Sequence, residues 1–278
     1  MTIDSHQHFW KYDPVEYPWI DEGTMSVLQR DFLPGDLKVL LAKYQVDFCL
    51  AVQARQSLDE TQFLLGLAEE NDFVRGVIGW IDLKTADLNK QVERLESPHL
   101  IGFRHVLQDE PDGFSLDPAF LRGVETILDN GYTYDILIYA HQLPEILEFV
   151  KHFSERPMVV DHIAKPNIRD GRILKWKQHM LELARHPNIH CKLSGMVTEA
   201  HWMYWSTDDF MPYIDHVLEC FGPDRCMFGS DWPVCTLAAS YGQVKELLDE
   251  CIRTLADEEK EAILGLTAAR FYGINNNP

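Results

Sequence analysis

Residues 133–163, TYDILIYAHQLPEILEFVKHFSERPMVVDHI, contain the pattern that decides the fold. Two β-branched and aromatic runs, at 133–140 and 157–163, have the length and composition of strands. The segment between them carries apolar residues at i, i+3, i+4 and i+7, which predicts a helix with one apolar stripe. The residues of this stripe are Leu143, Ile146, Leu147 and Val150. We therefore expect a strand–helix–strand unit with parallel strands and with the stripe packed on the sheet.

The same alternation extends along the whole chain. Short apolar runs separated by helix-like segments occur at 3–8, 46–54, 74–82, 100–107, 133–140, 157–163, 188–194 and 226–231. Two helix starts are also visible, since Asp59 with Gln62 forms a capping-box pattern and Asp117 precedes Pro118. Eight such units close a barrel more naturally than they extend an open sheet. Because no Pro-, Gly- or Ser-rich linker interrupts the chain, we expect one α/β domain over 1–278, a single (β/α)8 TIM-type barrel.

Composition limits the partners and the compartment. The chain has 44 Asp and Glu against 25 Lys and Arg, and its formal charge of -19 repels the phosphates of nucleic acid and of anionic lipid. The first residues, MTIDSHQHFWKYD, lack the basic and apolar regions of a signal peptide, and no window is apolar enough to span a membrane. The six cysteines form no CxxC pair, as expected of reduced thiols. We expect a cytoplasmic protein with no nucleic-acid or membrane partner, and homo-oligomerisation stays open.

Polar side chains end several of the predicted strands, and active sites of such barrels lie at these C-terminal ends. The residues at these positions are His6, Gln7, His8, Arg104, His105, Asp161, His162, Lys192 and Asp231. His6 and His8 point to the same face because they are two apart on a strand. Asp231 follows an apolar run, where a carboxylate is costly to bury without a partner. The structural alternatives are hydrogen-bonded core histidines and an Asp that caps a helix or loop.

Two chemistries fit this polar set. His6, His8 and Asp231 could hold one divalent metal ion, for which we expect Zn²⁺ before Mn²⁺, with an open position for water. The same residues could work without metal, as acid, base and oxyanion donors, with Asp231 and His162 catalytic. The sequence contains no GxSxG elbow, P-loop or GxGxxG fingerprint, so a serine hydrolase and a nucleotide-binding protein are set aside.

Further polar and aromatic residues are candidates for substrate binding, each with a packing alternative. Gln53 and Arg104 could hydrogen-bond a substrate, although a strand-end Arg pairs with an internal carboxylate about as often. Lys192 could bind substrate or belong to a buried ion pair. The remaining candidates are Trp80, His105, Trp232 and His141. The long aromatic stretches 9–35 and 196–212 are expected at the active-site end.

Several of these segments resemble the amidohydrolase superfamily and, within it, the sugar-lactonase branch that includes L-fuconolactonases, L-rhamnono-lactonases and 2-pyrone-4,6-dicarboxylate lactonases. They lie between residues 3 and 274 and read IDSHQHFW, GFRH, VVDHIAKP, CKLSG, MFGSDWP and TAARFYGI. The resemblance implies a hydrolase that opens a small-molecule sugar-acid lactone, with His6, His8, His162 and Asp231 at its polar centre. TYDILIYAHQ lacks the lysine that bridges two metals in binuclear members, so at most one metal is expected. The alternatives are a metal-dependent decarboxylase, a hydrolase of a dicarboxylate lactone and a sugar-acid-binding protein without catalysis.

Overall fold

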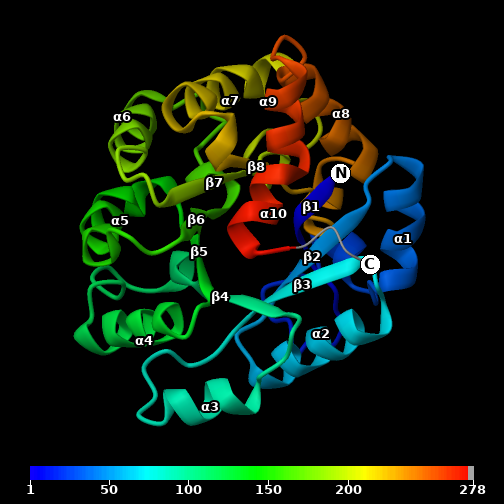
Figure 1. The fold of residues 1–278 in the computed structure, drawn as a ribbon. Helices are drawn as coiled ribbons and strands as arrows, with labels where there is room; N and C mark the ends of the chain where they lie inside the picture. Colours follow the sequence, from blue (N-terminus) through cyan, green and yellow to red (C-terminus); the bar gives the residue numbers. More distant parts are fainter. Residues whose placement is uncertain (275–278) are drawn as a thin grey trace.

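In the computed structural model, which describes residues 1–274, each of the eight predicted runs contains a strand. The strands are β1 (Ile3–Gln7), β2 (Phe48–Val52), β3 (Val74–Gly79), β4 (Leu100–Val106), β5 (Thr133–Leu137), β6 (Met158–Val160), β7 (Ile189–Leu193) and β8 (Cys226–Phe228). Each strand pairs in parallel with the next one along the chain. Figure 1 shows this ring of strands with the helices around its outside. The predicted (β/α)8 barrel is therefore confirmed.

Backbone hydrogen bonds bring the first and last strands together at their C-terminal ends. The amide of Asp231 donates to the carbonyl of His6 at 2.8 Å, and the amide of His8 donates to the carbonyl of Trp232 at 2.7 Å. Gln7 and Trp232 form a parallel bridge. The same bonds that nearly close the barrel thus hold the strand-1 histidines beside Asp231.

The helices follow the strands in strict alternation as far as β8. They are α1 (Pro34–Lys43), α2 (Leu58–Glu70), α3 (Leu88–Arg94), α4 (Pro118–Asp129), α5 (Leu143–Phe149), α6 (Leu174–Leu183), α7 (Thr207–Phe221), α8 (Tyr241–Cys251), α9 (Asp257–Glu261) and α10 (Thr267–Tyr272). Asp117 caps α4 as predicted, with Pro118 in the first turn. The predicted helix start at Asp59 is wrong by two residues. Ser57 is the N-cap of α2, because its hydroxyl accepts the Asp59 amide and satisfies an otherwise unpaired donor.

Apolar residues pack on both faces of the sheet. The predicted stripe Leu143, Ile146, Leu147 and Val150 is buried between α5 and the strands. Inside the barrel, a second cluster joins Ile3, Leu50 and Val159 to Tyr272 of α10. Because Tyr272 comes from the end of the chain and Ile3 from the start of β1, α10 covers the N-terminal end of the barrel (Figure 1). The C-terminal end of the barrel is not covered by α10, so a functional site can lie there.

Two further expectations concern the cysteines and membrane spans. All six cysteines are free thiols, five of them buried. None of the helices in the described part of the chain combines the length and hydropathy needed to cross a bilayer.

Candidate active site

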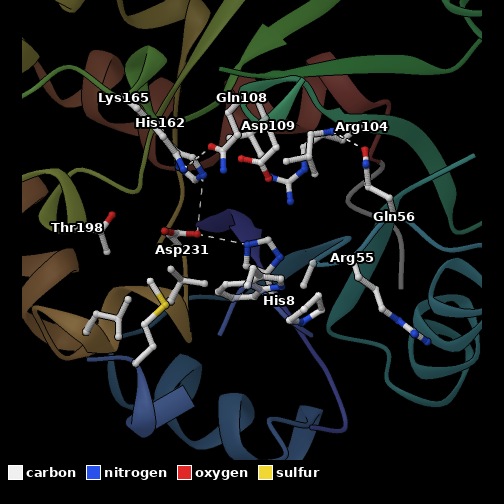
Figure 2. Close-up of a pocket in the computed structure, with 18 of the residues that line it drawn as sticks. His8, Arg55, Gln56, Arg104, Gln108, Asp109, His162, Lys165, Thr198 and Asp231 are labelled. Atoms are coloured by element: carbon white, nitrogen blue, oxygen red, sulfur yellow. Dashed lines mark hydrogen bonds and ion pairs between the residues drawn. The ribbon is translucent and has the colours of Figure 1, made fainter. Parts of the chain in front are cut away.

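A cavity of about 820 Å³ opens at the C-terminal ends of the strands. Four of the predicted site residues line it: His8, Arg104, His162 and Asp231. The two long aromatic stretches also reach it, as expected, through Val15, Glu16, Pro18, Trp19 and Met25 from the first and Thr198, Glu199 and Trp202 from the second. Figure 2 shows Asp231, His8 and His162 facing one another across the floor of this cavity. Side chains from β1, β6 and β8 therefore meet at one point, as their strand-end positions predict.

Asp231 is the centre of this group. Its Oδ1 lies 3.3 Å from His8 Nε2, 3.8 Å from His6 Nε2 and 3.9 Å from His162 Nε2. All four residues are at least 95% buried, and His6 lies directly below the cavity floor rather than in its lining. One carboxylate oxygen is thus surrounded by three imidazole nitrogens in a place where water is largely excluded.

The backbone around Asp231 and His162 is held in an unusual conformation. Asp231 has φ +57°, and the amide of the preceding Ser230 donates to the buried Asp4 Oδ1 at 2.8 Å. Residues 162–165 all have positive φ, between 43° and 60°. The left-handed conformation costs roughly 1–2 kcal/mol for each L-residue, and such strain is typical of functional sites. The left-handed turn directs both His162 and Lys165 toward the cavity.

A glycine makes room for the His162 ring. A Cβ at Gly195 would lie 2.3 Å from His162 Nδ1, and Gly195 itself has φ +59°. The neighbouring Ser194 hydroxyl lies 2.9 Å from the same Nδ1. The segment CKLSG, at the end of β7 and just beyond it, therefore supports the His162 ring from behind, and its glycine leaves no room for a larger side chain.

The hydrogen bonds of the histidines show which nitrogens are available. His8 Nδ1 faces the carbonyl of Val52 at 2.8 Å, so this nitrogen is the donor and neutral His8 presents a lone pair at Nε2. That lone pair faces the Asp231 carboxylate, an arrangement that a cation between them would stabilise. A backbone carbonyl that fixes the tautomer in this way is the usual outer partner of a metal-binding histidine. The ligand atoms of His6, His8 and Asp231 lie within 4.8 Å of one another, so this donor set fits one divalent metal ion.

Burial and neighbouring charges set the protonation states. Burial raises the pKa of the Asp231 carboxyl, but the neighbouring imidazoles of His162, His8 and His6 favour the ionised carboxylate more strongly, and the pKa lies below its ordinary value. Burial lowers the pKa of His162 to about 4 despite the opposing effect of Asp231. Burial also lowers the pKa of His6 well below the ordinary value. At neutral pH the site therefore combines an ionised carboxylate with neutral His6 and His162.

A buried ion network lies beneath the site. Lys192 Nζ is 2.5 Å from Asp135 Oδ2 and 3.2 Å from Asp161 Oδ1. Arg104 Nη1 donates to Asp161 Oδ2 at 2.9 Å and lies 3.3 Å from His6 Nε2. The positive and negative side chains of this network neutralise one another in the barrel interior. They also fix the position of the His6 ring, whose Nδ1 lies 3.3 Å from Asp161 Oδ1.

The other predicted substrate-binding residues do not line the cavity. Lys192 belongs to the ion network, and Gln53 lies below the floor, where its backbone carbonyl accepts from Arg104. Trp80 Nε1 donates to His105 Nδ1 at 3.3 Å, and His105 Nε2 lies 2.8 Å from Glu110 Oε1. Trp232 and His141 are also outside the lining: Trp232 packs on Phe9 and Phe32, and His141 lies exposed in a neighbouring cavity. The structure thus places Trp80, His105 and Trp232 in contacts with other side chains, Lys192 in a buried ion pair and His141 at an exposed position.

Sequence reasoning missed several polar residues of the cavity. Arg55 and Gln56 follow β2, Gln108 follows β4, Lys165 follows β6 and Glu199 follows β7. All of them lie two to six residues beyond a strand end, in the loops that carry function in this type of barrel. Lys165 donates to Gln108 Oε1 at 2.7 Å, so the two loops are joined across the cavity (Figure 2). Their position just after the apolar runs is the signal that could have identified them.

Comparison with known proteins agrees with this geometry. The protein-family model described as Amidohydrolase matches residues 3–274. An L-fucono-1,5-lactonase of Burkholderia multivorans is 42% identical, covering 99% of this chain and 96% of its own length, and one of Burkholderia ambifaria is 36% identical with the same coverage. A solved amidohydrolase of Burkholderia multivorans with bound Zn superposes with a TM-score of 0.96 at 42% identity, covering 99% of this chain and 100% of its own. The chain described here belongs to the amidohydrolase family.

Proposed function

We propose that this protein is a lactonase, which hydrolyses the internal ester of a sugar-acid lactone such as L-fuconolactone and releases the open-chain aldonate. The observation that carries the proposal is the ionised Asp231 carboxylate held among three histidines at the floor of a polar cavity. Relatives named L-fucono-1,5-lactonase, alike over nearly their whole length, support the sugar-acid class of substrate.

Asp231 acts as the general base and then as the general acid. Its carboxylate takes a proton from a water molecule as that water attacks the lactone carbonyl carbon. The tetrahedral intermediate collapses by breaking the bond to the ring oxygen, and Asp231 returns the proton to the departing alkoxide. One carboxylate serves both steps because the water and the ring oxygen are successive partners at the same carbon.

His162 and Arg104 stabilise the oxyanion that forms on the carbonyl. In the tautomer in which Ser194 donates to Nδ1, the His162 Nε2 carries the proton and can donate to the developing charge. Arg104 brings a permanent positive charge to the cavity wall, and Asp161 holds its guanidinium in place. In a buried site, fixed donors of this kind need no reorganisation during the reaction.

His6, His8 and Asp231 would hold one divalent metal ion, for which zinc suits the nitrogen and carboxylate donors. Such an ion would polarise the lactone carbonyl and lower the pKa of a water molecule. Contacts within the protein position these two histidines. The Val52 carbonyl keeps His8 Nε2 directed at Asp231, and Asp161 of the buried ion network holds the His6 ring in place.

The charges of the cavity favour an uncharged, hydroxyl-rich ring over a dicarboxylate. The cavity lining holds three Lys and Arg side chains. Arg104 is paired with Asp161 and Arg55 with Glu16, whereas Lys165 donates to the neutral Gln108 amide, so a dicarboxylate would find one such cation for its two charges. Gln56, Gln108 and Glu199 offer hydrogen-bond partners for sugar hydroxyls, and the indoles of Trp19 and Trp202 offer faces for the ring. The predicted binding residues Gln53, Trp80, His105, Lys192 and Trp232 then support the site through packing and ion pairs.

We infer that the whole chain, residues 1–278, is one catalytic domain that works in a reducing cytoplasm on a small-molecule substrate. The family match over 3–274 and the single eight-stranded sheet support a single domain. The six free cysteines support a reducing compartment.

Turnover of a lactone panel tests the proposal. L-Fucono-, L-rhamnono- and galactono-lactones are mixed with the enzyme and a pH indicator, with and without a chelator. Rapid acid release from at least one lactone is expected, because ring opening produces a carboxylic acid. Silence across the panel, together with CO₂ release from an aromatic or sugar carboxylic acid, would favour the decarboxylase instead.

A further inference from the structure

A second cavity, of about 780 Å³, adjoins the active-site cavity. It lies over the segment that follows β6, the start of α6 and the segment that follows β7. The two cavities share part of their walls, formed by Tyr139, Lys165, Thr198, Glu199 and Trp202. A molecule that leaves the active site on this side therefore meets the second cavity directly. Figure 2 labels two of the shared residues, Lys165 and Thr198, at the edge of the active-site cavity.

The second cavity is positively charged on an acidic protein. Its lining holds four cationic side chains, Lys165, Arg169, Arg172 and Lys175, and one carboxylate, Glu199. The chain as a whole carries a formal charge of -19. A local excess of positive charge on such a surface raises the local concentration of small anions.

Most of these cations have no carboxylate partner of their own. Within residues 1–274, no ion pair is formed by Arg169 or Lys175, and Arg172 Nε lies 3.9 Å from Asp170 Oδ2, too far for a hydrogen bond. Lys165 donates to the neutral Gln108 amide rather than to a carboxylate. Guanidinium and ammonium groups in this state retain donors for an incoming anion.

The backbone holds the cationic loop in place. The amide of Arg169 donates to the carbonyl of Glu199 at 2.9 Å, which joins the loops after β6 and β7. Trp176 Nε1 donates to the carbonyl of Ile163 at 2.8 Å and anchors the left-handed turn from α6. The cations are therefore carried on a braced segment, so less ordering is needed when a ligand binds.

The reaction proposed above changes the charge of its substrate. A sugar lactone is uncharged, whereas the aldonate formed by its hydrolysis carries one carboxylate at neutral pH. We propose that the second cavity binds the carboxylate of the open-chain aldonate and so draws the product away from Asp231. This inference rests on the proposed lactonase function for the identity of the anion, while the site itself rests on the cations that line the cavity.

Equilibrium binding of L-fuconate, measured by isothermal titration calorimetry, tests the site without relying on turnover. The triple variant Arg169→Gln, Arg172→Gln, Lys175→Gln removes three charges from exposed side chains, so the fold is retained. The matched control removes the same net charge from exposed positions outside the cavity, Lys43→Gln, Lys90→Gln and Arg253→Gln. Circular dichroism checks both variants.

We expect the dissociation constant of L-fuconate to rise about fivefold to tenfold in the triple variant, since each exposed charge contributes modestly. The control variant should keep the wild-type dissociation constant for L-fuconate. The uncharged L-fucitol should bind equally to the triple variant and to the control variant. Raising the ionic strength should weaken L-fuconate binding to the wild type.

Equal L-fuconate affinities in the triple and control variants, or no binding to the wild type, would overturn the site while leaving lactone turnover as evidence for the enzyme. The reverse pair of results, no lactone turnover but charge-dependent L-fuconate binding, shows that the two proposals can fail independently. Failure to open any lactone, together with loss of L-fuconate binding in the triple variant, would refute the proposed function and support the anion site.

Discussion

Replacing Asp231 with Asn tests the centre of the mechanism. The amide has the shape of the carboxylate but cannot accept a proton from water, and general base catalysis contributes about 10²–10⁴-fold. Asp231 Oδ1 also lies 3.3–3.9 Å from three imidazole nitrogens. We expect kcat to fall about a thousandfold, which is about 4 kcal/mol in activation free energy.

The fold should survive this change. His6 and His162 are neutral at pH 7 because burial lowers the pKa of both, so Asn at 231 leaves neither imidazole as a buried charge without a partner. Initial rates of acid release and thermal unfolding are measured for both Asp231→Asn and Asp109→Asn, the latter an exposed carboxylate of the same cavity. The control should keep its rate. An Asp231→Asn enzyme with more than a tenth of the parent activity would refute the assignment of the base.

Three further changes follow from the same geometry. Gly195→Ala should reduce kcat/KM at least about tenfold, because its Cβ would lie 2.3 Å from His162 Nδ1 and would displace this ring. Gly131→Ala is the control: Gly131 has φ +87° and open space around it, so the change should cost only about 1 kcal/mol of stability and no activity. We expect metal analysis of zinc-loaded wild type to give about one equivalent of zinc, His8→Ala to lose it, and His141→Ala, at an exposed histidine outside the site, to retain it. Burial raises the pKa of Glu60 from 4.5 to about 7, so the folded protein binds the Glu60 proton more tightly than the unfolded chain does. The stabilisation from this tighter proton binding is complete below pH 4.5 and is lost as the pH rises through 7. The unfolding free energy of wild type minus that of Glu60→Gln should therefore fall by on the order of 3 kcal/mol from pH 4 to 8, and a constant difference in denaturant titrations would contradict this.

The order of elements and the fold could be read from local pattern. Strand length, helical periodicity and the alternation between them are properties of neighbouring residues, which is why all eight strands were placed correctly. The convergence of His8, His162 and Asp231 also follows from sequence once the barrel is known, because parallel strands in a ring bring their C-terminal ends to one side. The prediction of Asp59 as the helix cap is wrong because Ser57, two residues earlier, accepts the Asp59 amide and caps α2, so Asp59 already lies within the first turn.

The tertiary structure decided which polar residues reach the cavity. Lys192 and Lys165 look alike in sequence, each close to the end of an apolar run, yet Lys192 points into the barrel, where Asp135 and Asp161 neutralise it. Lys165 reaches the cavity because four consecutive residues adopt positive φ, a conformation that no local preference of Ile, Ala or Lys predicts and that the surrounding packing imposes. Sequence by itself determined the barrel, its site-bearing end and the Asp231 centre. The direction of each remaining side chain, and the pairing of charges 31 to 57 residues apart, depended on contacts that form only when the strands close into a ring.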